Sequence, residues 1–497
     1  MGLIFRQSLK SSIGFYIGVL LGAINTLFIS TQFLTPDELG ISRILLENSL
    51  IFAAIAHLGI PSVCDRFFSR FRNNEEKHNG FLMFILIVPL VGFILFVIGY
   101  LLFFEEIQLF YQKKSPSILP YLWLNIPITL SWTYILVIET YIRGLGRTAI
   151  PTFLREVIFR GFTILLVVGV GIGLFNFEVF LYLYVVSMFL IIVVLILYIK
   201  KLGHLFIVPL SKKWSKTIIK EMLLYGLIII IGGIGVNLVL FLDRNIIANQ
   251  IGTTAVAIFI VASYIASIIE IPSKSIRQIT GPILATAVYE RNTKQIDELY
   301  KKSALNLMLI GGIMLLLISC SIENVLSLLP KSDIYLQGKW IVIVIGLAKW
   351  IDMSLGLNNE LISFSSYFRY NTYLYIFLAV LAVFANYFLI PIFGVLGSAL
   401  ATASISLLSS IIRFLIVRSI YQLNPFHKKD LIGLGILLIC FLVGYFIPSL
   451  GTSPIAKIST ITLKSTVILL IFSYLLIKWE ISDDVTKVWN LLLQKIK

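Results

Sequence analysis

Long runs of apolar residues, separated by short polar segments, dominate the pattern of this chain. Each run is close to the ~17–25 residues that an α-helix needs to cross the hydrocarbon core of a bilayer. The predicted fold class is therefore all-α, a polytopic membrane protein with about fourteen transmembrane helices. The predicted spans are 11–33, 44–63, 80–104, 118–138, 150–175, 180–199, 222–242, 253–271, 305–329, 340–357, 373–392, 396–417, 431–447 and 461–477.

The polar segments between the spans alternate in charge. Those that follow even-numbered spans are basic, for example Arg66, Arg70 and Arg72 after the second span, except that the tenth carries only Arg369. Lysine and arginine beside membrane spans are retained on the cytoplasmic side. Both termini are therefore expected in the cytoplasm. The alternation also supports the span count, because one missed helix would invert every later loop.

The composition excludes several classes of function. Of the 497 residues 58% are hydrophobic and 13% are charged, whereas soluble proteins are ~25% charged. Basic loops account for the net charge of +15 without a nucleic-acid partner. Cys64, Cys320 and Cys440 lack the spacing of a disulfide framework or a metal site. No loop could hold a soluble domain and no catalytic motif is present, so we expect no enzyme, catalytic residue or cofactor.

Ionisable side chains inside the predicted spans are the candidate functional residues. A charge at mid-membrane costs about 2.5–3.5 kcal/mol on insertion scales, so it tends to face a partner or a water-filled cavity. Arg155, Glu156 and Arg160 all lie in the fifth span. Glu156 and Arg160 are four residues apart and can pair along the helix. The alternative is that Arg155 and Arg160 bind an anionic substrate that enters from the cytoplasm.

The same charge argument gives the other candidates. Substrate-binding candidates are Arg143, Arg147 and Arg244, although Arg244 can instead pair with its neighbour Asp243 at the membrane interface. Candidates for binding a coupling proton or sodium ion are Glu47, His57 and Asp352. His57 can also be a structural residue, hydrogen-bonded to a neighbour.

The chain has a weak internal similarity. The segment 34–42 between spans one and two has a counterpart at 251–259 between spans seven and eight, and Ile-Pro-Ser follows each of them, at 60–62 and 271–273. Such repeats are typical of secondary transporters. They predict an N-terminal lobe at 1–203, a C-terminal lobe at 204–427, and two additional spans with a cytoplasmic tail at 428–497.

Several segments resemble the polysaccharide and O-antigen flippases of the multidrug/oligosaccharidyl-lipid/polysaccharide exporter (MOP) superfamily. Residues 386–402, NYFLIPIFGVLGSALAT, are similar to that family's hairpin N-x-x-L-I-P-x-F-G-x-x-G-A-A-x-A-T, with Ser398 in place of the first alanine. Weaker matches are 34–40 followed by His57-Leu58-Gly59, Leu242-Asp243-Arg244 followed by Gly252, and Arg143-Gly-Leu-Gly-Arg147. Together these matches extend over nearly the whole chain.

The resemblance implies a V-shaped bundle of two lobes around a central cavity that opens alternately to the two sides of the bacterial plasma membrane. It implies that the cargo is an undecaprenyl-pyrophosphate-linked oligosaccharide, moved to the outer leaflet for the synthesis of O-antigen, capsule or exopolysaccharide. The expected partners are this lipid-linked oligosaccharide, membrane lipids, a coupling proton or sodium ion, and the glycan polymerase and glycosyltransferase machinery. The alternatives are a multidrug exporter or a peptidoglycan-precursor flippase of the same superfamily, and a membrane-embedded glycosyltransferase or glycan polymerase.

Overall fold

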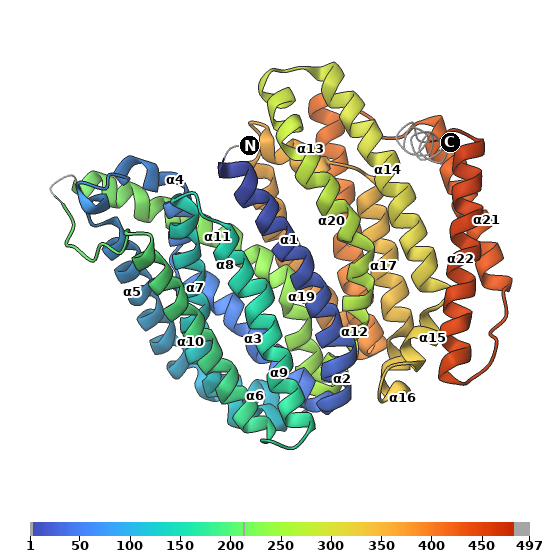
Figure 1. Ribbon diagram of the computed structural model, residues 1–497, viewed down its shortest axis with the longest axis horizontal. Helices are drawn as coiled ribbons and strands as arrows, with labels where there is room; N and C mark the ends of the chain where they lie inside the picture. Colours follow the sequence, from blue (N-terminus) through green and yellow to red (C-terminus); the bar gives the residue numbers. More distant parts are fainter. Residues whose placement is uncertain (1–2, 212–213, 482–497) are drawn as a thin grey trace. The chain divides into compact units, whose positions relative to one another are not determined.

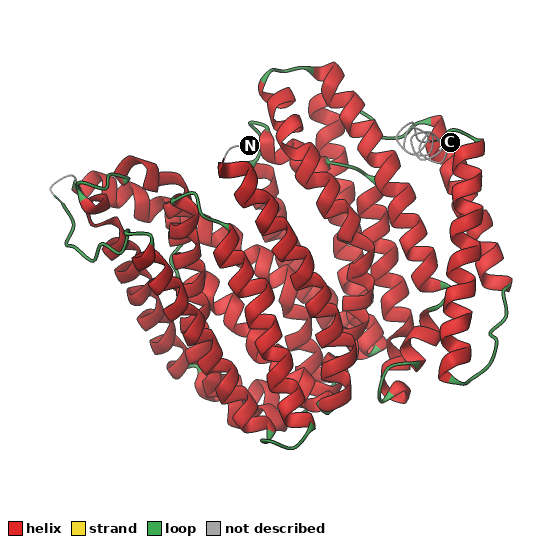
Figure 2. Ribbon diagram, in the orientation of Figure 1, coloured by secondary structure: helices red, strands yellow, loops and turns green. Residues whose placement is uncertain are grey.

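The protein is built of helices joined by short loops (Figure 2). The computed structural model describes residues 3–211 and 214–481, and over that part of the chain it contains no strand. Packing divides the chain into two compact units, residues 1–257 and 258–497, each with its own bundle of helices.

The first unit holds the helices coloured from blue to green in Figure 1. Within it, α7 packs against α3, α4, α5 and α10, and α11 packs against α3, α4 and α6. Its elements are α1 (Leu3–Ala23), the π-helix η1 (Ile24–Ile29), α2 (Ser30–Phe33), α3 (Pro36–Ala56), α4 (Ile60–Phe71), η2 (Lys77–Gly80), α5 (Phe81–Leu102), α6 (Phe104–Gln112), η3 (Pro116–Leu124), α7 (Asn125–Gly144), α8 (Ala149–Phe153), the π-helix η4 (Leu154–Phe159), α9 (Arg160–Gly171), α10 (Phe177–Lys201) and α11 (Lys216–Gln250).

Local sequence explains where α3 begins and ends. Thr35 accepts a hydrogen bond from the Glu38 backbone N–H, and the Glu38 carboxylate accepts one from the Thr35 backbone N–H, which forms a capping box. Pro36 stands at the first helical position, where its missing N–H costs nothing. Gly59, at a φ of +70°, separates α3 from α4. These ends fix α3 in the first unit, with Glu47 near its middle.

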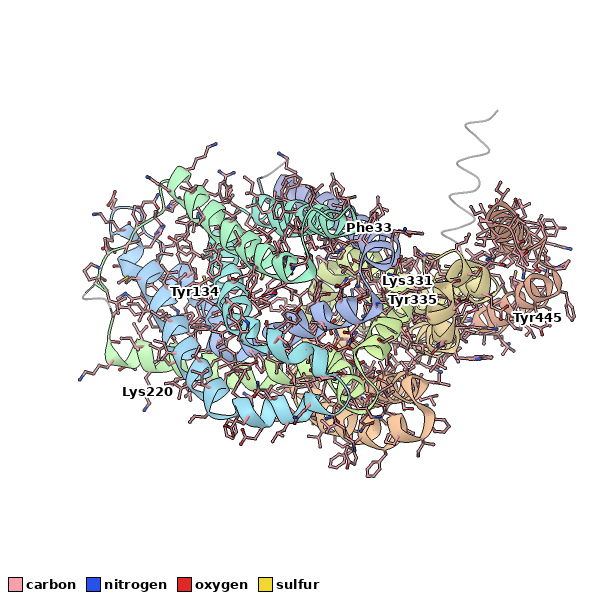
Figure 3. All side chains as sticks on the ribbon, turned by 90° about the horizontal axis from the view of Figure 1, so that it is seen from below. Phe33, Tyr134, Lys220, Lys331, Tyr335 and Tyr445 are labelled. Carbon is pink, nitrogen blue, oxygen red and sulfur yellow. The ribbon has the colours of Figure 1, made fainter. Side chains whose placement is uncertain are left out.

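Tyrosine side chains join the helices of this unit. Tyr134 of α7, labelled in Figure 3, donates a hydrogen bond of 3.0 Å to the Leu86 carbonyl of α5. Tyr100 of α5 donates one of 2.8 Å to the Leu122 carbonyl of η3. Such bonds satisfy the hydroxyl groups inside an apolar bundle.

The second unit continues from α12, which begins just before residue 258. Its long helices pack in the pairs α13 with α14, α14 with α17, α17 with α20, α19 with α20, and α21 with α22. Its elements are α12 (Thr253–Ser267), η5 (Ile268–Glu270), α13 (Ile271–Tyr289), α14 (Thr293–Ser319), α15 (Ile322–Ser327), α16 (Ser332–Tyr335), η6 (Leu336–Gly338), α17 (Lys339–Ser354), α18 (Asn358–Phe364), α19 (Arg369–Phe393), α20 (Val395–Tyr421), α21 (Lys428–Phe446) and α22 (Pro454–Lys478).

A glycine separates two consecutive helices of this unit. Gly356 adopts a φ of +74° between α17 and α18, a conformation that favours glycine over other residues. A Cβ atom there would lie 3.2 Å from the Ala304 Cβ of α14. The break therefore needs glycine both for its backbone and for its close contact.

The helices at the C-terminal end of the described chain share a core with α14. Met308 of α14, Ile436 and Cys440 of α21, and Ile468 and Phe472 of α22 are buried against one another. The pair α21 and α22 is red in Figure 1. Burial of these apolar side chains joins the pair to the rest of the second unit.

Twelve helices in the described residues are long and apolar enough to cross a membrane. The two other predicted spans also form helices, since 150–175 becomes α8, η4 and α9, and 222–242 lies within α11. Many apolar side chains remain exposed along these helices, for example Leu95, Leu165 and Leu470. Lipid would cover such a surface. The prediction of an all-α, multi-pass membrane protein with about fourteen spans is confirmed.

The extent of some helices was predicted wrongly. The eighth span was expected to end at 271, with Lys274 and Arg277 in a loop, but α13 continues the helical path to Tyr289. These cations are tolerated in a helix because carboxylates of the same unit lie beside them. The polar segment 289–302, whose sequence is compatible with a short helix on the cytoplasmic membrane face or with a solvated connector, contains the end of α13 and the first turns of α14.

The two compact units differ in extent from the lobes expected at 1–203 and 204–427, because α11 packs within the first unit. The division of the chain into two functional lobes and a C-terminal segment at 428–497 stays a prediction. The part of that last segment after residue 481 lies outside the described residues.

Candidate functional site

A cluster of two arginines and two glutamates lies between α7, η4 and α9 of the first unit. Arg155 Nη1 is 2.6 Å from Glu139 Oε2, and Arg155 Nε is 3.1 Å from Glu156 Oε1. Arg160 Nη2 is 2.7 Å from Glu156 Oε2. Glu156 thus bridges the two arginines with only 9% of its side chain exposed. The formal charges in this cluster balance.

Helix geometry brings α1 directly against this cluster. Arg160 donates a hydrogen bond of 2.9 Å to the Gly18 carbonyl of α1. A Cβ atom at Gly18 would lie 2.7 Å from the Glu156 Cβ, so only glycine allows this approach. Residues 154–159 form a π-helix, a feature that often occurs at functional sites.

A second cluster joins α3 to α11 in the first unit. Arg244 Nη1 is 2.7 Å from Asp243 Oδ1, and Arg244 Nε is 3.3 Å from Glu47 Oε2. Nearby, Tyr111 of α6 accepts a hydrogen bond from Asn48 Nδ2 (3.1 Å) and donates one to Asn245. Arg244 therefore pairs with Asp243, as one interpretation of the sequence expected, and also with Glu47 of another helix.

The remaining candidates in the first unit lie at helix ends. Arg143 makes a bidentate ion pair with Asp65 of α4, at 3.1 and 2.8 Å, in a half-exposed position. Arg147 lies, partly exposed, in the turn before α8. His57 ends α3, and its Nδ1 accepts a hydrogen bond of 3.1 Å from the Gly59 backbone N–H. That bond is the structural role that was weighed against proton binding for His57.

The second unit has its own line of charged side chains along α13 and α17. Lys349 of α17 contacts the Glu270 carboxylate, and Lys274 Nζ lies 3.4 Å from Glu270 as well. About one turn further along α17, Asp352 Oδ2 lies 3.4 Å from Arg277 Nη2. Charged residues that are three or four apart share one face of a helix. Both helices thus direct a charged face toward each other.

Asp352 belongs to a polar cavity of the second unit. Its Oδ1 accepts a hydrogen bond of 2.5 Å from Ser410 of α20, and Arg277 Nη1 lies 3.6 Å from Glu360 Oε1 of α18. The cavity has a volume of about 90 Å³. Its lining comes from α13, α17, α18, α19, α20 and Gly356 in the break between α17 and α18, namely Arg277, Asp352, Gly356, Asn358, Asn359, Tyr375, Ser410 and Arg413.

The sequence analysis missed several members of these networks. Arg277 and Glu360 were excluded because both were assigned to loops outside the spans. Lys349 lies inside the predicted span 340–357, so the rule that selects ionisable residues within spans should have included it. Which of the charged residues contact a substrate or a coupling ion stays a prediction.

Comparisons with known proteins place the chain in a family and a fold. Residues 7–287 match the family described as "Polysaccharide biosynthesis protein". No curated protein matches the sequence.

Several solved structures are similar to the chain, among them the following three. The one described as "Lipid II flippase MurJ, inward closed conformation" has a TM-score of 0.70 and 13% identity, with 95% of this chain and 100% of that chain covered. An inward-facing multidrug resistance MATE family transporter of the MOP superfamily has a TM-score of 0.64 and 18% identity, covering 82% and 94%. A MOP superfamily transporter from Pyrococcus furiosus, described by the reverse polarity of its binding pocket, has a TM-score of 0.57 and 16% identity, covering 84% and 95%. At these identities the similarity shows a shared fold.

Proposed function

The chain belongs to the polysaccharide biosynthesis protein family, and we propose that it is a flippase for a lipid-linked oligosaccharide. The cargo is an undecaprenyl-pyrophosphate-linked repeat unit, moved from the cytoplasmic to the outer leaflet of a bacterial plasma membrane by alternating access. The family match over residues 7–287 is the observation that carries the proposal. The resemblance of residues 386–402 to the polysaccharide flippase hairpin supports the same cargo.

Charge inside the membrane supports a polar cargo. The headgroup of a lipid-linked sugar must cross ~30 Å of hydrocarbon, whereas its lipid tail can remain in the bilayer. Charged side chains in spans are costly and mark the pathways of polar substrates. Arg155, Arg160 and Arg244 of the first unit and Arg277 of the second are candidates for contact with the pyrophosphate. Their carboxylate partners would keep the arginines compensated while no cargo is bound.

The best observation in favour of the multidrug alternative is the fold of the MATE family transporter. Cationic drugs favour unpaired buried acids in the binding site. In the clusters described above each buried acid of the first unit has an arginine partner instead. This pairing favours an anionic cargo over a cationic one.

Deletion of the gene in its host tests the proposal. We expect the loss of long surface polysaccharide and the accumulation of lipid-linked repeat units with the sugar in the cytoplasmic leaflet. Complementation with the wild-type gene is the control and should restore the polysaccharide. Normal polysaccharide together with new sensitivity to cationic dyes would contradict the proposal and favour drug export.

A further inference from the structure

The polar cavity of the second unit contains a buried cation without a carboxylate partner. Arg413 of α20 is 9% exposed, and its guanidinium lies 5.2 Å from the centre of the Tyr375 ring. Its Nε is buried without a hydrogen-bond partner, and among the described residues no carboxylate lies within 4.0 Å of the group. A buried charge is costly unless it is paired, and a ring face compensates a cation only in part.

Asp352, which lines the cavity, and Glu360 beside it are already engaged by other groups. Asp352 contacts Arg277 and Ser410, and Glu360 contacts Arg277 on its other side. Both carboxylates thus form their ion pairs with Arg277 and not with Arg413. The position of Arg413 is therefore open to a negatively charged ligand.

The unsatisfied groups that surround the cavity are mostly hydrogen-bond donors. Among the residues that line the cavity, the Nε atoms of Arg277 and Arg413 and the Nδ2 atom of Asn358 are buried without an acceptor, and beside the lining Glu360 Oε2 is buried without a donor. Asn358 is held in place by its Oδ1, which accepts a hydrogen bond of 2.5 Å from Tyr300. Donors thus outnumber acceptors among these unsatisfied groups, which favours a ligand that offers several acceptor oxygens.

The size of the cavity selects among acceptors. At about 90 Å³ it is far below the ~300–1,000 Å³ of pockets that enclose drug-sized ligands. It has room for several water molecules or for one group of phosphoryl size, and it is too small for a sugar repeat unit. Arginine is the residue best suited to bind phosphoryl oxygens, because its planar donors contact two oxygens at once.

We infer that this cavity of the second unit is a binding site for a phosphoryl oxyanion, with Arg413 as its main ligand and Arg277 and Asn358 as further donors. The oxyanion is either free inorganic phosphate or a phosphoryl group of the lipid-linked cargo. The inference rests on the proposed function only for the second of these sources.

Binding of three probes to the purified full-length protein in lipid nanodiscs tests the inference. The probes are inorganic phosphate, inorganic pyrophosphate and undecaprenyl pyrophosphate, each measured by calorimetry at constant ionic strength. Arg413→Gln should weaken binding by about tenfold to a hundredfold, as expected for the loss of a charge-assisted hydrogen bond. Arg418→Gln is the matched control, because Arg418 lies on the same helix but is exposed and outside the cavity.

A second variant keeps the test valid if Arg413→Gln does not fold. Asn358→Asp retains the oxygen that Tyr300 contacts but adds a negative charge beside the cavity, so it should also weaken oxyanion binding. If the inorganic anions bind and both variants weaken that binding, the ligand is a free oxyanion. If only undecaprenyl pyrophosphate binds, the ligand is the phosphoryl group of the cargo.

Two results would overturn the inference: no binding of any probe to the wild-type protein, or equal affinity in wild type, Arg413→Gln and Asn358→Asp. In either case water fills the cavity. Loss of inorganic phosphate binding in these variants would still support the site if gene deletion left surface polysaccharide unchanged. The inferred site and the proposed function can thus fail separately.

Discussion

At the scale of single residues, Glu156 is the side chain that pairs with both arginines of the fifth predicted span. It contacts Arg155 on one side and Arg160 on the other, and α1 packs directly on its Cβ. The four-residue spacing made the Glu156–Arg160 pair predictable. The pairing of Arg155 with Glu139 depends on how α7 packs, which the spacing of residues does not reveal.

Glu156→Gln should lower the stability of the protein. The variant keeps the shape of the side chain but leaves Arg160 without a carboxylate, for a cost of about 1.5–3 kcal/mol. The cost stays below that of a fully buried broken pair because Arg160 is 36% exposed. Thermal unfolding of the purified protein should show a decrease of a few degrees in apparent Tm. Glu75→Gln, in an exposed loop of the same unit, should leave the Tm unchanged, and an equal decrease in both variants would contradict this account.

At the scale of elements, α1 packs through two glycines one turn apart. Gly14 and Gly18 form a G-x-x-x-G pattern, which allows membrane helices to approach closely. A Cβ at Gly18 would lie 2.8 Å from the Glu156 carbonyl oxygen, whereas one at Gly14 would make an ordinary contact of 3.9 Å with Phe153.

The two glycines should therefore respond differently to the same substitution. Gly18→Ala forces α1 away from η4 and should cost about 1–3 kcal/mol, as overpacking does. Gly14→Ala adds the same atom in a position with room for it and should be close to neutral. Apparent Tm values of the two variants test this contrast, which a larger loss for Gly14→Ala would refute.

Hydrogen bonds and ring stacking hold the connection between α10 and α11 against the residues that precede α5. The backbone N–H of Asn73 donates to His78 Nδ1 (3.1 Å), so the proton of His78 lies on Nε2, which is 3.1 Å from His204 Nδ1. Trp214, at the other end of the connection, donates a hydrogen bond of 2.6 Å to the Asn79 carbonyl, and its ring stacks on Phe71. Neutral histidine at position 204 is thus an acceptor that holds this connection.

Acid should weaken this connection. Burial, and next the positive charge of Arg72, lower the pKa of His204 below its ordinary value of 6.5. Because the unfolded chain binds the proton first, the contribution of His204 to stability is complete above about pH 6.5 and decreases as the pH falls. The apparent Tm should decrease between pH 7.5 and 5.5, and His204→Asn should reduce that decrease.

His427→Asn is the matched control for this experiment, because His427 lies at the start of α21, outside the connection. It should keep the acid sensitivity of the wild-type protein. An identical pH profile for wild type and His204→Asn would show that the histidine pair does not titrate as described.

The elements of this fold could be predicted from the sequence more fully than the charge networks could. Apolar runs locate the spans, and Thr35-Pro36-Asp37-Glu38 is readable as a helix start. The continuation of α13 was missed because Lys274 and Arg277 suggested a loop. The contact of Glu47 with Arg244 and that of Asp352 with Ser410 join helices that are far apart in the sequence. Without a known packing of the helices, an ionisable residue in a span indicates a partner but does not identify it.

At the scale of the whole molecule, the protein combines membership of the polysaccharide biosynthesis protein family and a fold similar to that of MOP superfamily transporters with charged groups in both units. Transport against a gradient requires a source of energy, and the proposed source is a proton or sodium gradient bound through Glu47, His57 or Asp352. In vesicles that contain the protein, dissipation of both gradients and of the membrane potential should reduce translocation of the cargo strongly. Dissipation of each gradient alone should identify the ion, and unchanged translocation without any gradient would exclude this coupling.

The central claim is that the charged groups inside the spans carry a lipid-linked oligosaccharide across the membrane. Its most direct test measures translocation of a labelled undecaprenyl-pyrophosphate-linked oligosaccharide in proteoliposomes, through its accessibility to a reagent that cannot cross the membrane. The double variant Arg155→Gln/Glu139→Gln removes both partners of one ion pair, so that no carboxylate is left without its cation. We expect rapid translocation by the wild-type protein and at least about tenfold slower translocation by the folded double variant, equivalent to about 1.4 kcal/mol. Equal rates for wild type, double variant and protein-free liposomes would contradict the claim.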